Sequence, residues 1–227
     1  MTYASAGTAA AAAGMVGNAG AAVTFIDYND TVIVDTAVGD ANWTGFNVDF
    51  NGDAQVDVVV AYRQFSATSG TANIFPAAGA TTSVVGVISA GFNYPSRLAA
   101  GASVGPSAAF IAVNGGLQQG RGDMAWGPGY SSSRWVAPTG GPAATGYLGV
   151  KFKIGADDYF GWVRVSVEPN GAPSPRGVTV HDAAYESVAG VGIVAGNTGV
   201  PEPGGVGLLA LGGAGLTMLR RRRAQAA

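Results

Sequence analysis

The most constraining feature of this 227-residue chain is a regular alternation of apolar and polar residues in two consecutive segments. In residues 146–154, Leu, Val, Phe and Ile occupy every second position, and in residues 159–167 three valines do the same. Such alternation places one set of side chains on one face of a strand, so both segments predict half-buried β-strands. The Gly-Ala-Asp-Asp sequence at 155–158 predicts the connection of a β-hairpin.

The rest of residues 23–199 contains shorter segments of the same kind, separated by turns rich in Gly, Pro, Ser and Asn. Further strands are predicted at residues 23–26, 31–34, 42–50, 55–62, 83–89 and 108–113. No stretch in this range shows the three-to-four-residue periodicity of an amphipathic helix. We therefore predict one all-β domain over residues 23–199, an antiparallel β-sandwich or jelly roll, with residues 114–142 as its longest loop.

The amino-acid composition restricts the chemical groups and the partners that this domain can have. The chain contains no cysteine, which excludes disulfides, thiol nucleophiles and thiolate metal ligands. Charged residues make up 11% of the chain, well below the roughly 25% typical of globular domains. Before Arg220, eight basic residues stand against fourteen acidic ones and leave a net charge of −6. This balance argues against a nucleic-acid partner.

The N-terminal segment, residues 1–22, is rich in Ala and Gly and carries no charged side chain. Its apolar stretch and the small residues Ala19, Gly20 and Ala21 predict a signal peptide with a small-x-small cleavage site. The basic region that usually begins such a peptide is missing, which fits an imperfect or truncated signal peptide. A simple Ala/Gly-rich arm is the alternative interpretation.

The C-terminal segment, residues 200–227, has three parts in a fixed order. They are the tripeptide Pro201, Glu202 and Pro203, an uncharged apolar run over residues 206–219, and the basic cluster Arg220, Arg221, Arg222 and Arg223. As a helix the run would measure roughly 21 Å, which is short for a permanent membrane span but adequate for a transient one. The arginines are expected on the cytoplasmic side, with the preceding domain outside.

This order of motifs resembles the PEP-CTERM sorting signal of exported bacterial proteins. The resemblance implies that an exosortase-type enzyme cleaves near residues 201–203 and releases the protein or passes it to the cell surface. Residues 146–152, 159–165 and 184–187 also resemble the C-terminal half of PEP-CTERM surface proteins, which adds no activity. The implied partners are the export machinery, the processing enzyme, the inner membrane before cleavage, and exopolysaccharide in an extracellular matrix.

Acidic and amide side chains recur at alternate positions within residues 49–57. The candidate calcium ligands are Asp49, Asn51, Asp53, Gln55 through its backbone carbonyl, and Asp57. The spacing resembles calcium loops of the pattern Asp-x-Asn-x-Asp-x-x-x-Asp, in which oxygen ligands converge on one Ca²⁺. Ala54 stands where such loops carry glycine, so we expect a strained turn. The alternative is a turn that uses Asp and Asn for its backbone geometry alone.

Groups suited to catalysis are scarce. His181 is the single histidine, and Asp182 beside it should point to the opposite face of a strand, so this pair does not make a Ser-His-Asp unit. Asp157 and Asp158 fit a hairpin connection better than the paired carboxylates of glycoside hydrolysis. We therefore expect no enzymatic activity.

Two functions are consistent with these features. The first is a noncatalytic surface or extracellular-matrix protein of a bacterium. The second is a secreted carbohydrate-binding, lectin-like module in which the aromatic residues Trp126, Tyr130 and Trp135 of the long loop stack on sugar rings. Against the second function stands the interpretation that these aromatic side chains belong to the core beneath the loop.

Overall fold

The computed structural model describes residues 22–35, 39, 42–66, 69–77, 81–89, 91–113, 122–126, 134–135, 143–169 and 175–199. The strands in these ranges are β1 (Val23–Ile33), β2 (Thr44–Val48), β3 (Val58–Ser66), β4 (Ser69–Pro76), β5 (Thr82–Ser89), β6 (Phe92–Pro95), β7 (Ser103–Val104), β8 (Phe110–Val113), β9 (Gly122–Trp126), β10 (Ala144–Ile154), β11 (Asp157–Pro169), β12 (Pro175–Glu186) and β13 (Ile193–Val194). The predicted all-β class is confirmed for this part of the chain. No helix occurs among the described residues, so none of them forms a membrane-spanning helix.

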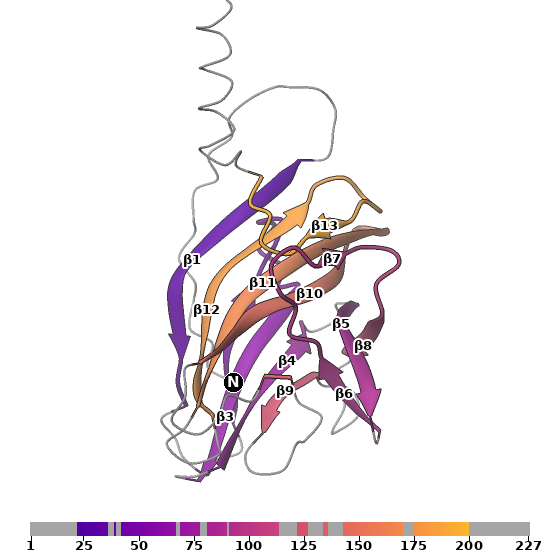
Figure 1. Cartoon of the computed structure of the whole chain (residues 1–227). Coiled ribbons are helices and arrows are strands. Elements are labelled where there is room, and N and C mark those ends of the chain that lie inside the picture. Colours follow the sequence, from indigo (N-terminus) through magenta and orange to yellow (C-terminus); the bar gives the residue numbers. More distant parts are fainter. Residues whose placement is uncertain are drawn as a thin grey trace, which may run out of the picture.

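One long sheet contains most of the strands and bends over on itself (Figure 1). Its order is β1-β12-β11-β10-β5-β6-β9-β4-β3-β2, and β8 pairs with β5 beside this path. Strand β5 links two parts of the sheet, because residues 82–85 pair with β8 and residues 86–89 pair with β6. The pairing is antiparallel apart from one parallel contact between β6 and β9. The bend brings β12 against β3 and β4.

The hairpin predicted from the alternating pattern is confirmed. Strand β10 pairs with β11 in an unbroken antiparallel register, for example Leu148 with Val163. The connection is shorter than predicted, because Asp157 already pairs with Ile154 at the start of β11. Gly155 has φ +63° and is followed by one further turn residue, as in a type II′ turn, whose twist matches that of the flanking strands.

Both faces of this hairpin are buried, although the alternation predicts only one. Leu148, Val163 and Val165 lie in the main core, between the two layers of the bent sheet. On the opposite face, Phe160 and Trp162 pack in a second cluster beneath the small β7–β13 sheet. The β7 and β13 strands that cover this second face are distant in sequence from the hairpin. The alternating pattern of the hairpin therefore could not predict that this face is buried.

Candidate functional site

The most distinctive polar cluster lies where β12 loses its regular pairing with β11. Arg164 of β11 pairs with Asp182, but the next residue, Val165, pairs with Val180. His181 is therefore an extra residue on β12, the arrangement of a β-bulge. Bulges re-aim side chains and occur frequently next to functional sites.

The neighbouring strand β1 is irregular at the same level. Asp27 pairs with Asp182 and Thr31 with Val180, so three residues of β1 lie opposite one residue of β12. Two of them, Asn29 and Asp30, have φ angles of +51° and +52°. Asn and Asp adopt this left-handed conformation more readily than other residues with a side chain. The local sequence thus permits a turn that carries Asp30 toward β12.

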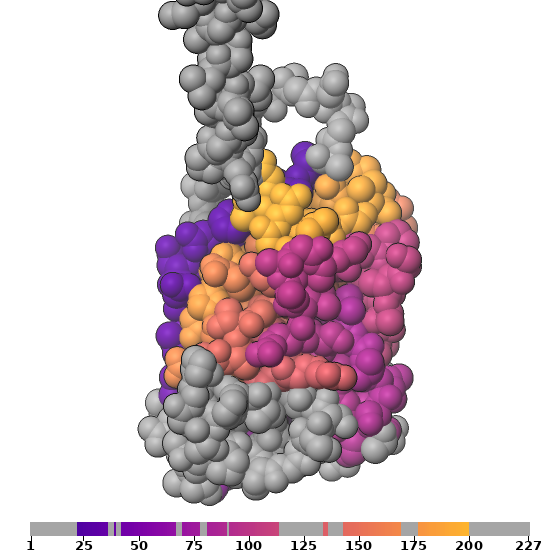
Figure 2. All heavy atoms as spheres, in the orientation of Figure 1, coloured from indigo at the N-terminus to yellow at the C-terminus, as the bar shows by residue number. Residues whose placement is uncertain are grey.

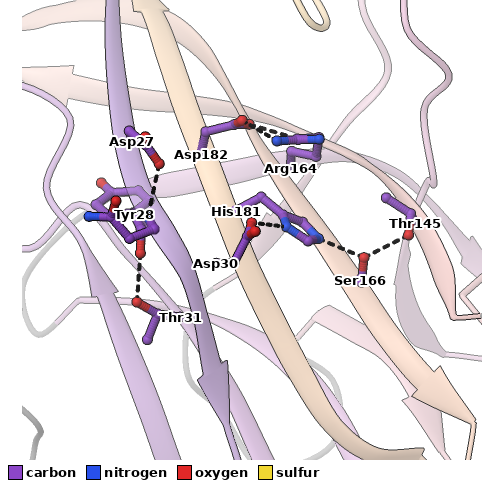
Figure 3. A network of polar contacts seen from close by, with 10 residues as sticks. Asp27, Tyr28, Asp30, Thr31, Thr145, Arg164, Ser166, His181 and Asp182 are labelled. Atoms are coloured by element: carbon purple, nitrogen blue, oxygen red, sulfur yellow. Dashed lines mark hydrogen bonds and ion pairs between the residues drawn. The ribbon is translucent and has the colours of Figure 1, made fainter.

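The two irregularities assemble a hydrogen-bonded chain across four strands (Figure 3). Asp30 Oδ1 lies 2.5 Å from His181 Nδ1. His181 Nε2 lies 2.7 Å from Ser166 Oγ, which in turn lies 2.6 Å from Thr145 Oγ1. Ser166 is buried, whereas the Asp30 side chain is 73% exposed. We call these four residues the polar relay.

Carboxylate, imidazole and hydroxyl in this order are also the elements of an activated serine nucleophile. The sequence analysis correctly separated His181 from Asp182, whose carboxylate instead receives two hydrogen bonds from Arg164. It missed the relay because Asp30 and Ser166 lie 151 and 15 residues from His181. The sequence analysis considered only Asp182 as a partner of His181 and did not identify Asp30 or Ser166.

The surroundings of Ser166 favour a structural role. Ser166 lies within β11 and is paired with Thr145 on one side and Thr179 on the other. Backbone amides in such a doubly paired strand are engaged in the sheet ladder, so they are not available as an oxyanion hole beside Oγ. Oxyanion stabilisation is usually the largest single contribution to acyl transfer. The relay is better suited to fastening β1, β12, β11 and β10 together.

We expect that a fluorophosphonate probe leaves Ser166 unlabelled, because the backbone amides of its own strand are engaged in the sheet and do not stabilise an oxyanion beside Oγ. Intact-mass analysis of the wild-type chain and of Ser166→Ala measures this directly. The two proteins should show the same absence of an adduct. A stoichiometric adduct on Ser166 that disappears in His181→Ala would contradict the structural role.

The acidic loop, residues 49–57, is held by bonds from its own backbone. Asp49 accepts the backbone N–H groups of Gly52 and Ala54 at 2.8 and 2.9 Å. Asp53 accepts the N–H of Gln55 at 2.8 Å. Ala54 has φ +65°, so the expected strained turn is confirmed. These contacts are the turn chemistry that the sequence analysis gave as the alternative to calcium.

Asp57, at the end of this loop, is 8% exposed and accepts the N–H of Phe50 at 2.8 Å. Burial raises the pKa of its carboxyl to about 7, with smaller contributions from the charges of Asp49 and Asp53, against the lowering effect of the Phe50 hydrogen bond. Within the described ranges, no three acidic or histidine side chains are grouped to hold a metal ion. Calcium binding by Asp49, Asn51, Asp53, Gln55 and Asp57 stays a prediction.

The predicted sugar-stacking residues do not form one described surface. Trp135 is fully buried, and its indole N–H donates to the carbonyl of Pro95 at 3.0 Å. A ring enclosed by the core has no face for a sugar, so the stacking prediction is wrong for Trp135. Trp126 belongs to β9 and pairs with Thr71, whereas Tyr130 lies outside the described residues.

The predicted processing sites also lie outside the described part of the chain. They are the residues 1–21 of the predicted signal peptide, the tripeptide at 201–203, the apolar run and the arginines Arg220 to Arg223. No protein-family model, curated protein or solved structure matches the chain.

Proposed function

We propose that the chain is a noncatalytic, exported surface or extracellular-matrix protein of a bacterium that is sorted through its C-terminal segment. The observation that carries this proposal is the order of the three terminal motifs, Pro-Glu-Pro, apolar run and arginine cluster, at residues 201–223. The apolar run can hold the chain in the inner membrane until an exosortase-type enzyme cleaves near residues 201–203. The arginines favour the orientation that leaves the domain outside.

The proposed domain is a β-sandwich of jelly-roll type over residues 23–199. The packing of β12 against β3 and β4 supports this arrangement, as does the change of partners along β5. The two described core clusters extend from Val23 to Ile193. Cleavage near residues 201–203 would therefore remove no described core side chain, which suits a domain that functions after the tail is lost.

The first and last described residues of the domain lie close together, which also supports the proposal. Ser187 donates its backbone N–H to the carbonyl of Ala22 at 2.9 Å. A Cβ placed on Gly199 would lie 3.0 Å from the Val23 side chain, so the two backbones are in close contact there. The predicted signal peptide and sorting tail would thus leave the domain at the same end.

Mass spectrometry of the mature protein tests the proposal. We expect a C-terminus near residues 201–203, an N-terminus near Val23, and loss of the four arginines. Replacing Pro201, Glu202 and Pro203 with alanine should leave the uncleaved chain in the membrane fraction. A surface-exposed protein that retains Arg220 to Arg223 would overturn the proposed route.

A further inference from the structure

Two segments without charged residues meet at the end of the domain where the chain leaves. Residues 98–113 and residues 187–199 contain no Asp, Glu, Lys, Arg or His. They are joined by the β7–β13 pairing and by bonds in which the N–H of Gly101 donates to Ala195 and that of Ala195 donates to Ala102. Figure 2 shows the yellow end of the domain against the neighbouring magenta residues. We call these two segments the uncharged cap.

The cap exposes apolar side chains. Val188 and Val194 are each 43% exposed, and Val191 is 36% exposed. On β13 the buried Ile193 holds the strand to the domain, while Val194 beside it is exposed. At the rim, Gly190 bonds to the carbonyl of Asp158, whose carboxylate forms an ion pair with Lys153 at 2.9 Å. This ion pair offsets the charge of Asp158 at that point of the boundary.

The position of the cap ties it to the sorting tail. Gly199 is the last described residue of the cap, and the apolar run begins at Val206. The connecting chain reaches at most roughly 25 Å even when fully extended. While the apolar run lies in a membrane, this short tether keeps the cap close to the bilayer. A tethered surface has a high effective concentration, so weak apolar contacts are sufficient for binding.

We infer that the uncharged cap is a lipid-facing surface, on which the domain rests against the bilayer before its tail is cleaved. This inference rests on the proposed function, because the tail must be in the membrane. The three exposed valines would enter the boundary between headgroups and acyl chains, where apolar side chains gain from leaving water. The absence of charge on the cap removes the cost of dehydrating ionised groups on approach.

The cysteine-free chain allows a direct test with single reporter cysteines. The full chain carrying Val191→Cys is labelled with the fluorophore NBD and reconstituted in vesicles of phosphatidylcholine and phosphatidylglycerol. The matched control is Val32→Cys, since Val32 is also an exposed valine, 57% exposed. Val32 pairs with Thr179, seven residues along β12 from Glu186, the partner of Val23, which places it roughly 23 Å from the chain exit.

Lipid-attached spin labels should quench the fluorophore at position 191 several-fold more strongly than at position 32, with a blue shift only at 191. Protease protection of the arginine cluster reports separately on insertion of the tail. Equal quenching at both positions in a chain with an inserted tail would overturn the lipid-facing cap and leave the proposed function intact. A tail that does not insert would overturn both. Burial of position 191 only when the processing enzyme is added would mark the cap as a protein-docking surface instead.

Discussion

Replacing Trp135 with alanine is expected to lower the free energy of unfolding by about 3–5 kcal/mol, the usual cost of truncating a large buried aromatic residue. Trp135 is fully buried in the main core, so its removal leaves a large cavity. The variant also loses the hydrogen bond from the indole N–H to Pro95, which joins positions 40 residues apart. Urea titration followed by circular dichroism measures the change.

Trp135→Phe is the matched control because it keeps most of the apolar volume and removes the indole N–H. It should cost less, although an unsatisfied Pro95 carbonyl still adds about 1–3 kcal/mol. A glycan array with both variants separates packing from sugar recognition. The burial assigned to Trp135 would be contradicted if Trp135→Ala unfolded like the wild type and lost binding to a sugar.

Replacing Asp57 with asparagine is expected to raise the free energy of unfolding at about pH 8 by up to about 4 kcal/mol and to change it little at about pH 4. The reason is the buried Asp57 carboxyl, whose pKa is raised to about 7. The folded state holds this proton more tightly than the unfolded chain. The resulting stabilisation is complete below about pH 4 and is lost as the pH rises through about 7. Asparagine carries no charge and keeps an oxygen for the N–H of Phe50.

A series of urea titrations between these two pH values measures the effect. Asp53→Asn is the matched control, because it removes a charge from an exposed position of the same loop. It should change the stability by less than about 1 kcal/mol at any pH. If the wild-type and Asp57→Asn proteins were equally stable at the higher pH, burial of the Asp57 carboxylate would not be unfavourable and the prediction would be wrong.

Thermal unfolding with and without calcium tests the predicted calcium site in the same loop. A bound ion would favour the ionised carboxylates of residues 49–57, so calcium should raise the thermal midpoint most above the Asp57 pKa. Asp53→Ala should abolish that shift. A midpoint that is the same with calcium and with EDTA would leave the acidic loop as a turn held by its own backbone bonds.

The sequence predicted the features that depend on neighbouring residues. The alternation in residues 146–154 and 159–167 was sufficient for the β10–β11 hairpin, and the missing glycine at position 54 was sufficient for the strained turn. Both follow from local backbone geometry, which a short window of sequence contains.

The polar relay and the position of Trp135 depend on long-range order instead. Asp30 reaches His181 only because β1 pairs with β12 and both strands are irregular at the same level. Trp135 lies in a segment rich in Gly, Ser and Pro, which is typical of an exposed loop. Its ring is nevertheless buried in the core. No periodicity within either segment encodes the partner strand, so these contacts required the structure.

The pairing of β1 with β12 also sets the order in which the domain can fold. Val23, in the first strand, pairs with Glu186, close to the end of the domain. A newly made chain therefore holds β1 without its partner until nearly the whole domain has been synthesised, and closing so large a loop is slow. If the chain is exported as proposed, β1 would still be unpaired while the chain passes through a membrane channel, and the fold would be completed on the far side.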